Sequence, residues 1–247
     1  DKPLYKNNFG PFLDGFKILP YNSISDLKSN INEKTSGVFL EFIQGEGGVV
    51  PANQDFIDIL FELKNKYNFL IVADEIQAGM GRTGKFFAFE HYNVEPDIAT
   101  SSKGLGGGLP LGAILVRDYL KDVFQKSEHG STFGGNPLAC ATGLASLIEI
   151  ENNLMDNTKI QGGYFINKLK GIASNFPKFI SNVQGKGLMI GLKLTFPAKD
   201  LVNKLLDYGI ISNATNQNVL RIVPPLIINK QDIDEFCLAL NKSLETF

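Results

Sequence analysis

Residues 68–75 read NFLIVADE, a nearly continuous apolar run that ends in two carboxylates. Such a run is typical of a strand buried on both faces of a parallel sheet. Further strand-like runs flank it at GVFLEFI (37–43), PDIATSS (96–102) and LGAILV (111–116). Apolar residues at helical spacing over 56–67 predict an amphipathic helix between the first two strands. This alternation of strands and helices predicts an α/β sheet.

The sequence pattern changes after about residue 152. Just before this point, a helix is predicted over 134–151, with Asn136 as its cap and Pro137 in its first turn. Beyond it, the sequence predicts a polar helical stretch, a strand at 185–194, a helix near 198–208, a second strand within VLRIVPPLII (219–228) and a C-terminal helix. We therefore expect a partial large α/β domain at 1–151 and a small α+β domain at 152–247.

The composition argues against several classes of protein. The 247 residues carry a formal net charge of −2, which provides no general attraction for nucleic acid or an anionic membrane. No apolar run has the length that a bilayer span requires. Cys140, Cys237 and the two histidines lack the spacing of a disulfide framework or a zinc site. We expect a cytoplasmic protein that binds no metal, nucleic acid or membrane.

Three polar segments follow predicted strands or precede a predicted helix. Asp74 ends one strand, Lys103 follows another within SSKGLGGGLPLG (101–112), and HGSTFGGN (129–136) precedes a helix. Ligands of open α/β sheets bind beyond the carboxyl ends of the strands. The glycine-rich loop matches neither common nucleotide-binding pattern, because its lysine precedes the glycines and Leu109 replaces the third glycine of GxGxxG. A nucleotide site is therefore a minor alternative.

The same residues suit covalent chemistry with pyridoxal phosphate. A lysine that bonds to this cofactor needs to be buried, with backbone packed close around it. Glycines permit that approach because they lack a Cβ atom. The ring nitrogen of the cofactor stays protonated when a carboxylate faces it. Lys103 and Asp74 are the candidates for these two roles.

Three stretches resemble the class III aminotransferases: FLIVADEIQAGMGRTGKFFAFEHYNVEPDIATSSKGLGGGLPLGAILV (69–116), EFIQGEGGVVPANQDF (41–56) and HGSTFGGNPLACATG (129–143). The resemblance continues through GKGLMIGLKL (185–194) to VLRIVPPLI (219–227) and is greatest to the acetylornithine aminotransferases. It implies the PLP-dependent transferase fold (fold-type I, aspartate aminotransferase-like) for the large domain. It also implies pyridoxal 5'-phosphate as cofactor and a homodimer with shared active sites.

The resemblance implies roles for individual residues near the cofactor. Lys103 would be the Schiff-base lysine and the base that moves a proton between substrate and cofactor. Asp74 would pair with the pyridinium nitrogen, and Gln77 would reach the phenolic oxygen. Glu75 and Ile76 lie between these two in the cofactor-binding stretch, and Glu75 is expected to have a structural role.

Four further residues are implied to bind phosphate or substrate. Thr132 would hydrogen-bond the phosphate in the partner subunit's site, with Ser131 close to substrate. Glu46 would pair with Arg221 whenever no α-carboxylate is bound. One site could then accept both an amine and the diacid glutamate, because an arginine binds a carboxylate in a bidentate manner.

Two departures from the family are visible. Phe42 stands where the family usually has proline. The family's N-terminal segment holds a phosphate-binding turn, an aromatic residue over the cofactor and an arginine for the substrate, and residues 1–36 correspond to later material. The large domain is therefore expected to be incomplete at its N-terminus.

The predicted function is amino-group transfer from N-acetylornithine to 2-oxoglutarate in arginine biosynthesis. Ornithine, N-succinylornithine and 4-aminobutyrate are alternative amino donors. A non-catalytic fragment that lacks the phosphate-binding segment is a further alternative.

Overall fold

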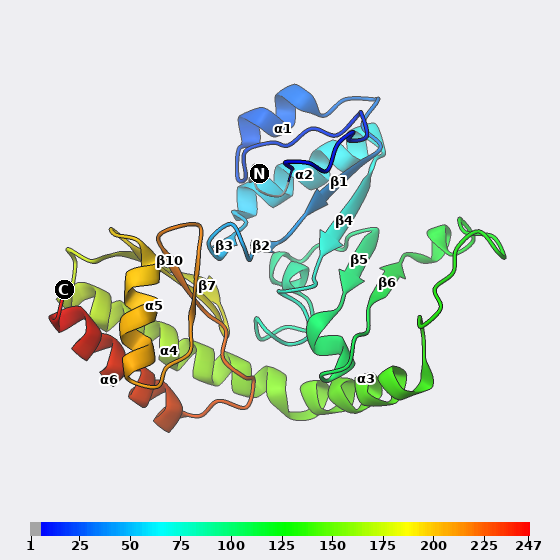
Figure 1. Cartoon of the computed structure of the whole chain (residues 1–247). Coiled ribbons are helices and arrows are strands. Elements are labelled where there is room, and N and C mark those ends of the chain that lie inside the picture. The colour runs from blue at the N-terminus through cyan, green and yellow to red at the C-terminus, as the bar shows by residue number, and fades with distance from the viewer. Residues whose placement is uncertain (1–5) are drawn as a thin grey trace. The chain divides into compact units, whose positions relative to one another are not determined.

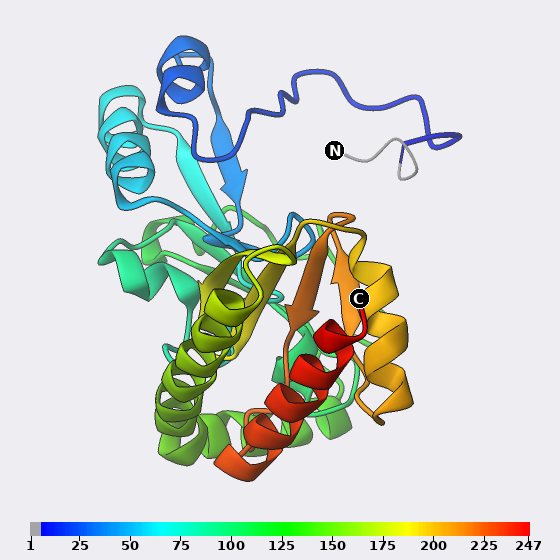
Figure 2. The same ribbon diagram turned by 90° about the vertical axis from the view of Figure 1, so that its left-hand side faces the viewer.

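The computed structural model describes residues 6–247, which divide into two compact units (Figures 1 and 2). Unit 1 comprises the chain up to Ser36 together with Ala52–Phe69, and unit 2 comprises Gly37–Pro51 and Leu70–Phe247. Residues 1–5 of the first predicted domain lie outside the described part of the chain. The predicted domain boundary after residue 151 stays a prediction.

The described residues of unit 1 form two helices. Helix α1 (Ile24–Asn30) is capped by Ser23, whose hydroxyl accepts a hydrogen bond from Asp26 N at 3.4 Å. Helix α2 (Gln54–Tyr67) is the amphipathic helix that the apolar spacing predicts. It buries Phe56, Ile57, Leu60 and Leu63. The helix ends at Asn68, whose left-handed φ of 56° is better tolerated by asparagine than by most residues.

The predicted α/β sheet is present in unit 2 (Figure 1). Its strands are β1 (Gly37–Leu40), β4 (Leu70–Asp74), β5 (Ile98–Ser101) and β6 (Ala113–Val116), in that spatial order. Strands β1, β4 and β5 run parallel, whereas β6 is antiparallel to β5. The direction of β6 departs from a purely parallel sheet because the connection from β5 is too short for a parallel crossover.

The apolar run at 37–43 forms two strands instead of one. Strand β1 ends at Leu40, and β2 (Ile43–Gln44) pairs with β3 (Val50–Pro51) in a short hairpin. The intervening turn contains the acidic residue Glu46 and the glycines beside it. The break after β1 therefore separates the sheet from the turn that carries this acid.

The C-terminal part of unit 2 is built on an antiparallel sheet. Its strands are β7 (Ile180–Lys186), β8 (Met189–Leu194), β10 (Val219–Ile222) and β9 (Asn213–Thr215), in that spatial order. The helices beside it are α4 (Met155–Asn175), α5 (Ala198–Asp207) and α6 (Lys230–Glu245), shown in Figure 2. One buried cluster joins all three helices to the sheet, including Leu169, Leu192, Leu205, Leu220 and Leu240.

Helix α3 (Pro137–Glu149) begins as the sequence predicts. The Asn136 side chain accepts a hydrogen bond from Ala139 N at 2.9 Å, and Pro137 occupies the first turn. A π-helical segment, η5 (Ile150–Leu154), joins α3 to α4, and Figure 1 shows the three following one another. None of the helices within residues 6–247 is long and apolar enough to cross a membrane.

Candidate active site

Three charged side chains follow the carboxyl ends of neighbouring parallel strands. Glu41 directly follows β1, Asp74 ends β4, and Lys103 lies shortly after the end of β5. Asp74 is in register with Thr100 of β5, and Glu75 N donates to Thr100 O at 3.1 Å. The sheet thus places these groups at the edge where α/β proteins bind ligands.

The backbone of Lys103 adopts a left-handed conformation with φ 47°, which is uncommon for a residue with a side chain. The loop that it starts, η3 (Lys103–Gly106), is tied to α3 because Thr142 Oγ1 donates to Gly106 O at 2.9 Å. Before the lysine, Ser102 Oγ donates to Leu111 O at 2.8 Å. Hydrogen bonds on both sides of Lys103 therefore hold its backbone in place.

Two glycines permit the close approach between this loop and α3. A Cβ atom at Gly107, where φ is 58°, would lie 2.4 Å from Ser146 Oγ and 3.1 Å from Thr142 O. A Cβ atom at Gly143 of α3 would lie 3.0 Å from Leu105 O. The predicted packing around the lysine backbone is present. The side chain of Lys103 is nevertheless exposed, contrary to the expected buried amine, because this packing acts on the loop backbone.

Asp74 and Gln77 lie in the turn that follows β4. The half-buried Asp74 carboxylate accepts a hydrogen bond from Ile76 N at 3.0 Å through Oδ1. Gln77 packs against the turn between β2 and β3, since a Cβ atom at Gly45 would lie only 2.3 Å from Gln77 Oε1. Ile76, Gln77 and Lys103 all line one cavity.

Glu75 has a structural environment. Its side chain is fully buried and accepts hydrogen bonds from Ala88 N at 2.8 Å and Phe89 N at 3.0 Å. Burial raises the pKa of the Glu75 carboxyl to about 7, although the two backbone N–H groups lower it. The carboxylate thus anchors the start of the short helix η2 (Ala88–Tyr92), as its expected structural role requires.

Glu41 belongs to the site and was not singled out by sequence reasoning. Its carboxylate accepts a hydrogen bond from Gly45 N at 2.7 Å. Burial raises the pKa of this carboxyl, the charges of Asp74 and Glu46 raise it further, and Lys103 lowers it. The signal that could have identified it is a charged residue inside the otherwise apolar run at 37–43.

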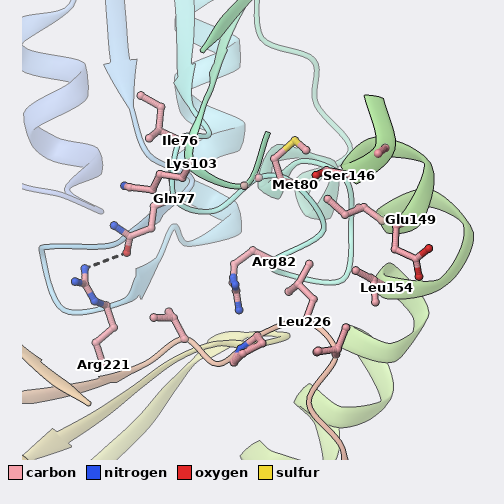
Figure 3. A pocket seen from close by; sticks show the side chains of 17 residues that line it. Ile76, Gln77, Met80, Arg82, Lys103, Ser146, Glu149, Leu154, Arg221 and Leu226 are labelled. Atoms are coloured by element: carbon pink, nitrogen blue, oxygen red, sulfur yellow. Dashed lines mark hydrogen bonds between the residues drawn. The ribbon is translucent and has the colours of Figure 1, made fainter. Parts of the chain in front are cut away.

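Glu46 and Arg221 form an ion pair. Arg221 Nη1 lies 2.5 Å from Glu46 Oε1 and also donates to Gln77 Oε1 at 3.1 Å, as Figure 3 shows for Gln77. The Nε atom of Arg221 donates to Asn213 Oδ1 at 3.2 Å. Asn213, which sequence reasoning missed, faces Arg221 only because β9 and β10 pair in register. Thr215 Oγ1 in β9 donates a hydrogen bond to the backbone oxygen of Glu46 at 2.7 Å.

Ser131 and Thr132 lie apart from these groups. Both are exposed in the segment between η4 (Asp118–Leu120) and α3, and Ser131 Oγ accepts a hydrogen bond from Gly134 N at 3.1 Å. Neither residue lines the cavity that Lys103 lines. Their predicted roles, with Thr132 acting in a partner subunit, stay predictions.

A cavity of about 710 Å³ lies beside Lys103 in unit 2 (Figure 3). Three cationic side chains reach it, from Lys103, Arg82 and Arg221, and Glu149 of α3 is the acidic group in its wall. The remaining wall is mostly apolar and includes Met80, Ile150, Leu154, Val223, Leu226 and Ile227. An apolar cavity with a few convergent polar groups is typical of a small-molecule site.

The side chains at the strand ends fit pyridoxal phosphate by their chemistry. Lys103 provides an amine that can bond to an aldehyde, and Asp74 provides a carboxylate for a protonated ring nitrogen. The Gln77 oxygen accepts from Arg221, so the Gln77 nitrogen is left to donate to a phenolic oxygen. Gly45 leaves the space that Gln77 occupies, because any Cβ atom there would overlap the amide.

Comparisons with known proteins agree with this chemistry. The class-III aminotransferase family matches residues 1–244. The acetylornithine aminotransferase of Methanocaldococcus jannaschii is 45% identical over 242 residues, which are 98% of this chain and 61% of that protein. Ornithine aminotransferase 1 of Staphylococcus saprophyticus is 43% identical over 243 residues, again 98% of this chain and 61% of that protein. The chain thus spans about six-tenths of the length of these curated relatives.

Solved structures show the same fold. The ornithine aminotransferase of Toxoplasma gondii ME49 superposes with a TM-score of 0.92 at 34% identity, over 97% of this chain and 58% of that one. The acetylornithine aminotransferase of Elizabethkingia anophelis has a TM-score of 0.86 at 33% identity, over 93% of this chain and 62% of that one. A further Toxoplasma gondii ornithine aminotransferase structure, with a TM-score of 0.91, has partial occupancy of PLP at its active site.

The fold-type I prediction is confirmed by these structures. The class-III aminotransferases are PLP-dependent, which agrees with the predicted cofactor. The sequence motifs, the strand-end side chains and the family match over nearly the whole chain lead to one conclusion: this chain belongs to the class-III aminotransferase family.

Proposed function

We propose that the protein is a PLP-dependent aminotransferase that moves the amino group of N-acetylornithine to 2-oxoglutarate, giving glutamate. The observation that carries this proposal is the convergence of Lys103, Gln77 and Arg221 on one cavity at the strand ends. The relatives named acetylornithine aminotransferase, at up to 45% identity, support the choice of amino donor.

The residues divide the chemistry among them. Pyridoxal phosphate, when bound, supplies an electron-accepting ring. Lys103 Nζ would hold the cofactor covalently, and as the free amine it would take the proton from the donor carbon and return it during amino transfer. The Asp74 carboxylate would keep the ring nitrogen protonated, and Gln77 Nε2 would donate to the phenolic oxygen.

Glu46 and Arg221 would let one site accept two kinds of substrate. With the amino donor bound, Arg221 stays paired with Glu46, so its charge is neutralised. With 2-oxoglutarate bound, Arg221 would leave Glu46 and bind the substrate carboxylate through two parallel hydrogen bonds. Glu46 is largely exposed and can turn into solvent, whereas Arg221 is only 12% exposed and stays in the site.

We also propose a homodimeric, cytoplasmic enzyme of arginine biosynthesis. The exposed segment with Ser131 and Thr132 supports shared active sites, because a partner subunit could receive it. The relatives' names support the pathway. Thr132 would then bind the cofactor phosphate of the partner's site, with Ser131 near that substrate.

Ornithine is a second candidate amino donor. Relatives named ornithine aminotransferase reach 43% identity, and several of the similar structures have the same name. Comparing N-acetylornithine, ornithine, N-succinylornithine and 4-aminobutyrate, each with 2-oxoglutarate, would decide between the donors. The proposal expects the largest kcat/KM for N-acetylornithine, and a larger value for ornithine would replace it.

The test of the cofactor chemistry is the visible spectrum of the purified chain with pyridoxal phosphate. We expect an absorbance band from covalently bound cofactor, its loss on adding glutamate, and no band for Lys103→Ala. Lys199→Ala, which removes an exposed lysine of α5, serves as the matched control and should keep the band. A wild-type chain that forms no band would support the non-catalytic alternative instead.

A further inference from the structure

Arg82 joins the two halves of the candidate site. It lies in the turn that follows β4 (residues 75–84, here the β4 turn), which also carries Gln77. Its Nη1 atom donates to Pro224 O, three residues after Arg221, and to Leu188 O at 3.3 Å. Figure 3 shows Arg82 between Gln77 and the segment that contains Leu226.

The two carbonyls that accept hydrogen bonds from Arg82 lie just outside neighbouring strands of the C-terminal sheet. Leu188 directly precedes β8, and Pro224 follows shortly after β10. In that sheet Arg221 is in register with Gly191 of β8. The backbone completes the junction, because Leu188 N donates to Arg82 O at 3.1 Å. Arg82 therefore fixes β8 and β10 together against the β4 turn.

The β4 turn has a second connection to β10, and the proposed change of partner by Arg221 would break it. It is the 3.1 Å hydrogen bond from Arg221 Nη1 to Gln77 Oε1. If Arg221 turns to a substrate carboxylate, it gives up this bond together with its pair to Glu46. The bonds made by Arg82 do not involve the Arg221 side chain, so they remain while Arg221 changes partners.

Other hydrogen bonds to the C-terminal sheet reach different segments. Thr215 and Asn216 bind carbonyls of the turn between β2 and β3. Asn157 of α4 donates to Leu226 O at 2.6 Å and to Ile228 O at 3.0 Å. Asn157 and Arg82 thus both donate hydrogen bonds to the loop between β10 and α6. The acceptors of Asn157 lie farther along the chain from Arg221 than the acceptor of Arg82.

We propose that Arg82 is a positioning residue that sets the spacing between Lys103 and Arg221 while Arg221 binds the α-carboxylate of the 2-oxo acid substrate. This inference rests on the proposed function and adds a specificity-determining residue to it. Replacing Arg82 would slow the half-reaction in which Arg221 binds substrate more than it slows the amino-donor half-reaction. The amino-donor half-reaction keeps the Glu46–Arg221 pair and the bond to Gln77, which hold β10 in place.

The environment of Arg82 suits this role. Burial lowers the pKa of the guanidinium to about 10, so it stays charged at neutral pH. Charged donors make stronger hydrogen bonds than neutral ones, and the planar guanidinium can reach two carbonyls at once. A lysine keeps the charge on a single compact head group and lacks this fixed geometry.

The first experiment compares Arg82→Lys with the wild-type protein, both loaded with cofactor. We expect kcat/KM for 2-oxoglutarate to fall about tenfold or more, the range for losing charged hydrogen bonds. The rate constant of the amino-donor half-reaction should change less than about threefold, because that half-reaction keeps Arg221 paired with Glu46. Asn157→Ala is the matched control, and it should lower thermal stability while leaving the ratio of the 2-oxoglutarate rate to the amino-donor rate unchanged.

Equal losses in the 2-oxoglutarate and amino-donor half-reactions of Arg82→Lys would show that Arg82 merely stabilises the fold, and the proposal would be wrong. Unchanged rates in both half-reactions would overturn it as well. A second measurement needs no activity: amide hydrogen exchange of the cofactor-free protein. Arg82→Lys should lose protection from exchange in the segments 186–192 and 219–225. Unchanged protection there would refute the proposed positioning role of Arg82. If the wild type transfers no amino group, the proposed function fails while this measurement still tests the contacts.

Discussion

Arg221 Nη1 donates a hydrogen bond of 2.5 Å to Glu46 Oε1 across 175 positions of the chain. The two partners differ in exposure, since the Arg221 side chain is 12% exposed and that of Glu46 is 56% exposed. A largely buried cation paired with an exposed acid can exchange that acid for a substrate carboxylate at low cost, because the acid returns to water. The geometry of the pair thus suits a reversible contact.

Removing the acid should favour the diacid substrate. In Glu46→Gln, Arg221 has no carboxylate partner, so 2-oxoglutarate no longer competes with one. We expect KM for 2-oxoglutarate to fall several-fold and the amino-donor half-reaction to slow, as measured by stopped-flow absorbance of each half-reaction. Thermal stability should change by less than about 1 kcal/mol, because Glu46 is largely exposed. Glu95→Gln, which removes the acid paired with Arg117, is the control and should leave both half-reactions unchanged.

Gly107 should not tolerate a side chain. Gly107→Ala places a Cβ atom 3.1 Å from Thr142 O at a φ of 58°, so both the backbone strain and the contact with α3 oppose it. We expect a loss of about 1–3 kcal/mol in the free energy of unfolding and weaker covalent binding of the cofactor by Lys103.

A glycine in open surroundings is the control for that substitution. A Cβ atom at Gly163 of α4 meets nothing within 4 Å. Gly163→Ala should therefore stabilise the protein by about 0.5–1 kcal/mol, the difference in helix propensity. Urea denaturation of both variants would check the pair. A Gly107→Ala variant as stable as the wild type would contradict the close packing of the loop on α3.

The buried carboxyl of Glu75 should make stability depend on pH. Its folded-state pKa, about 7, lies above the ordinary value of 4.5 because of burial. The protonated form is therefore favoured in the folded state, and this contribution is complete below pH 4.5 and lost as pH rises through 7. The loss corresponds to about 3 kcal/mol at roughly 1.4 kcal/mol for each pKa unit.

Urea unfolding of the wild type and Glu75→Gln at several pH values would measure this effect. The stability of the wild type relative to Glu75→Gln should decrease between pH 4.5 and pH 8, because glutamine does not titrate. Glu235→Gln, which alters an exposed acid of α6, should show no such trend relative to the wild type. A difference between the wild type and Glu75→Gln that stays constant with pH would show that Glu75 does not titrate in this range.

Local sequence patterns predicted the elements that position the lysine half of the site. The apolar run before Asp74 and the alternation around it indicated an α/β sheet, since burial on both faces demands apolar residues throughout. Asn136 and Pro137 marked the start of α3, because helix capping depends on neighbouring residues only. The strand-end rule then placed Asp74 and Lys103 at one edge of the sheet.

Contacts between distant segments were beyond such patterns. The role of Arg82 and the register that brings Asn213 beside Arg221 depend on how whole elements pack. The exposure of the Lys103 side chain also departed from expectation, since only its backbone is enclosed by the described residues. Family resemblance alone suggested that Glu46 meets Arg221.

The sequence by itself therefore determined the helices α2 and α3, the apolar strand before Asp74 and the identity of the chemical groups at the strand ends, because each depends on residues close together in the chain. Only the tertiary structure decided which groups meet. Glu46 pairs with Arg221, and Arg82 donates a hydrogen bond to Pro224 O just after the strand that carries Arg221. Both contacts join positions more than a hundred residues apart. Such contacts form because packing of two sheets and their helices brings these segments together, and no local pattern records that arrangement.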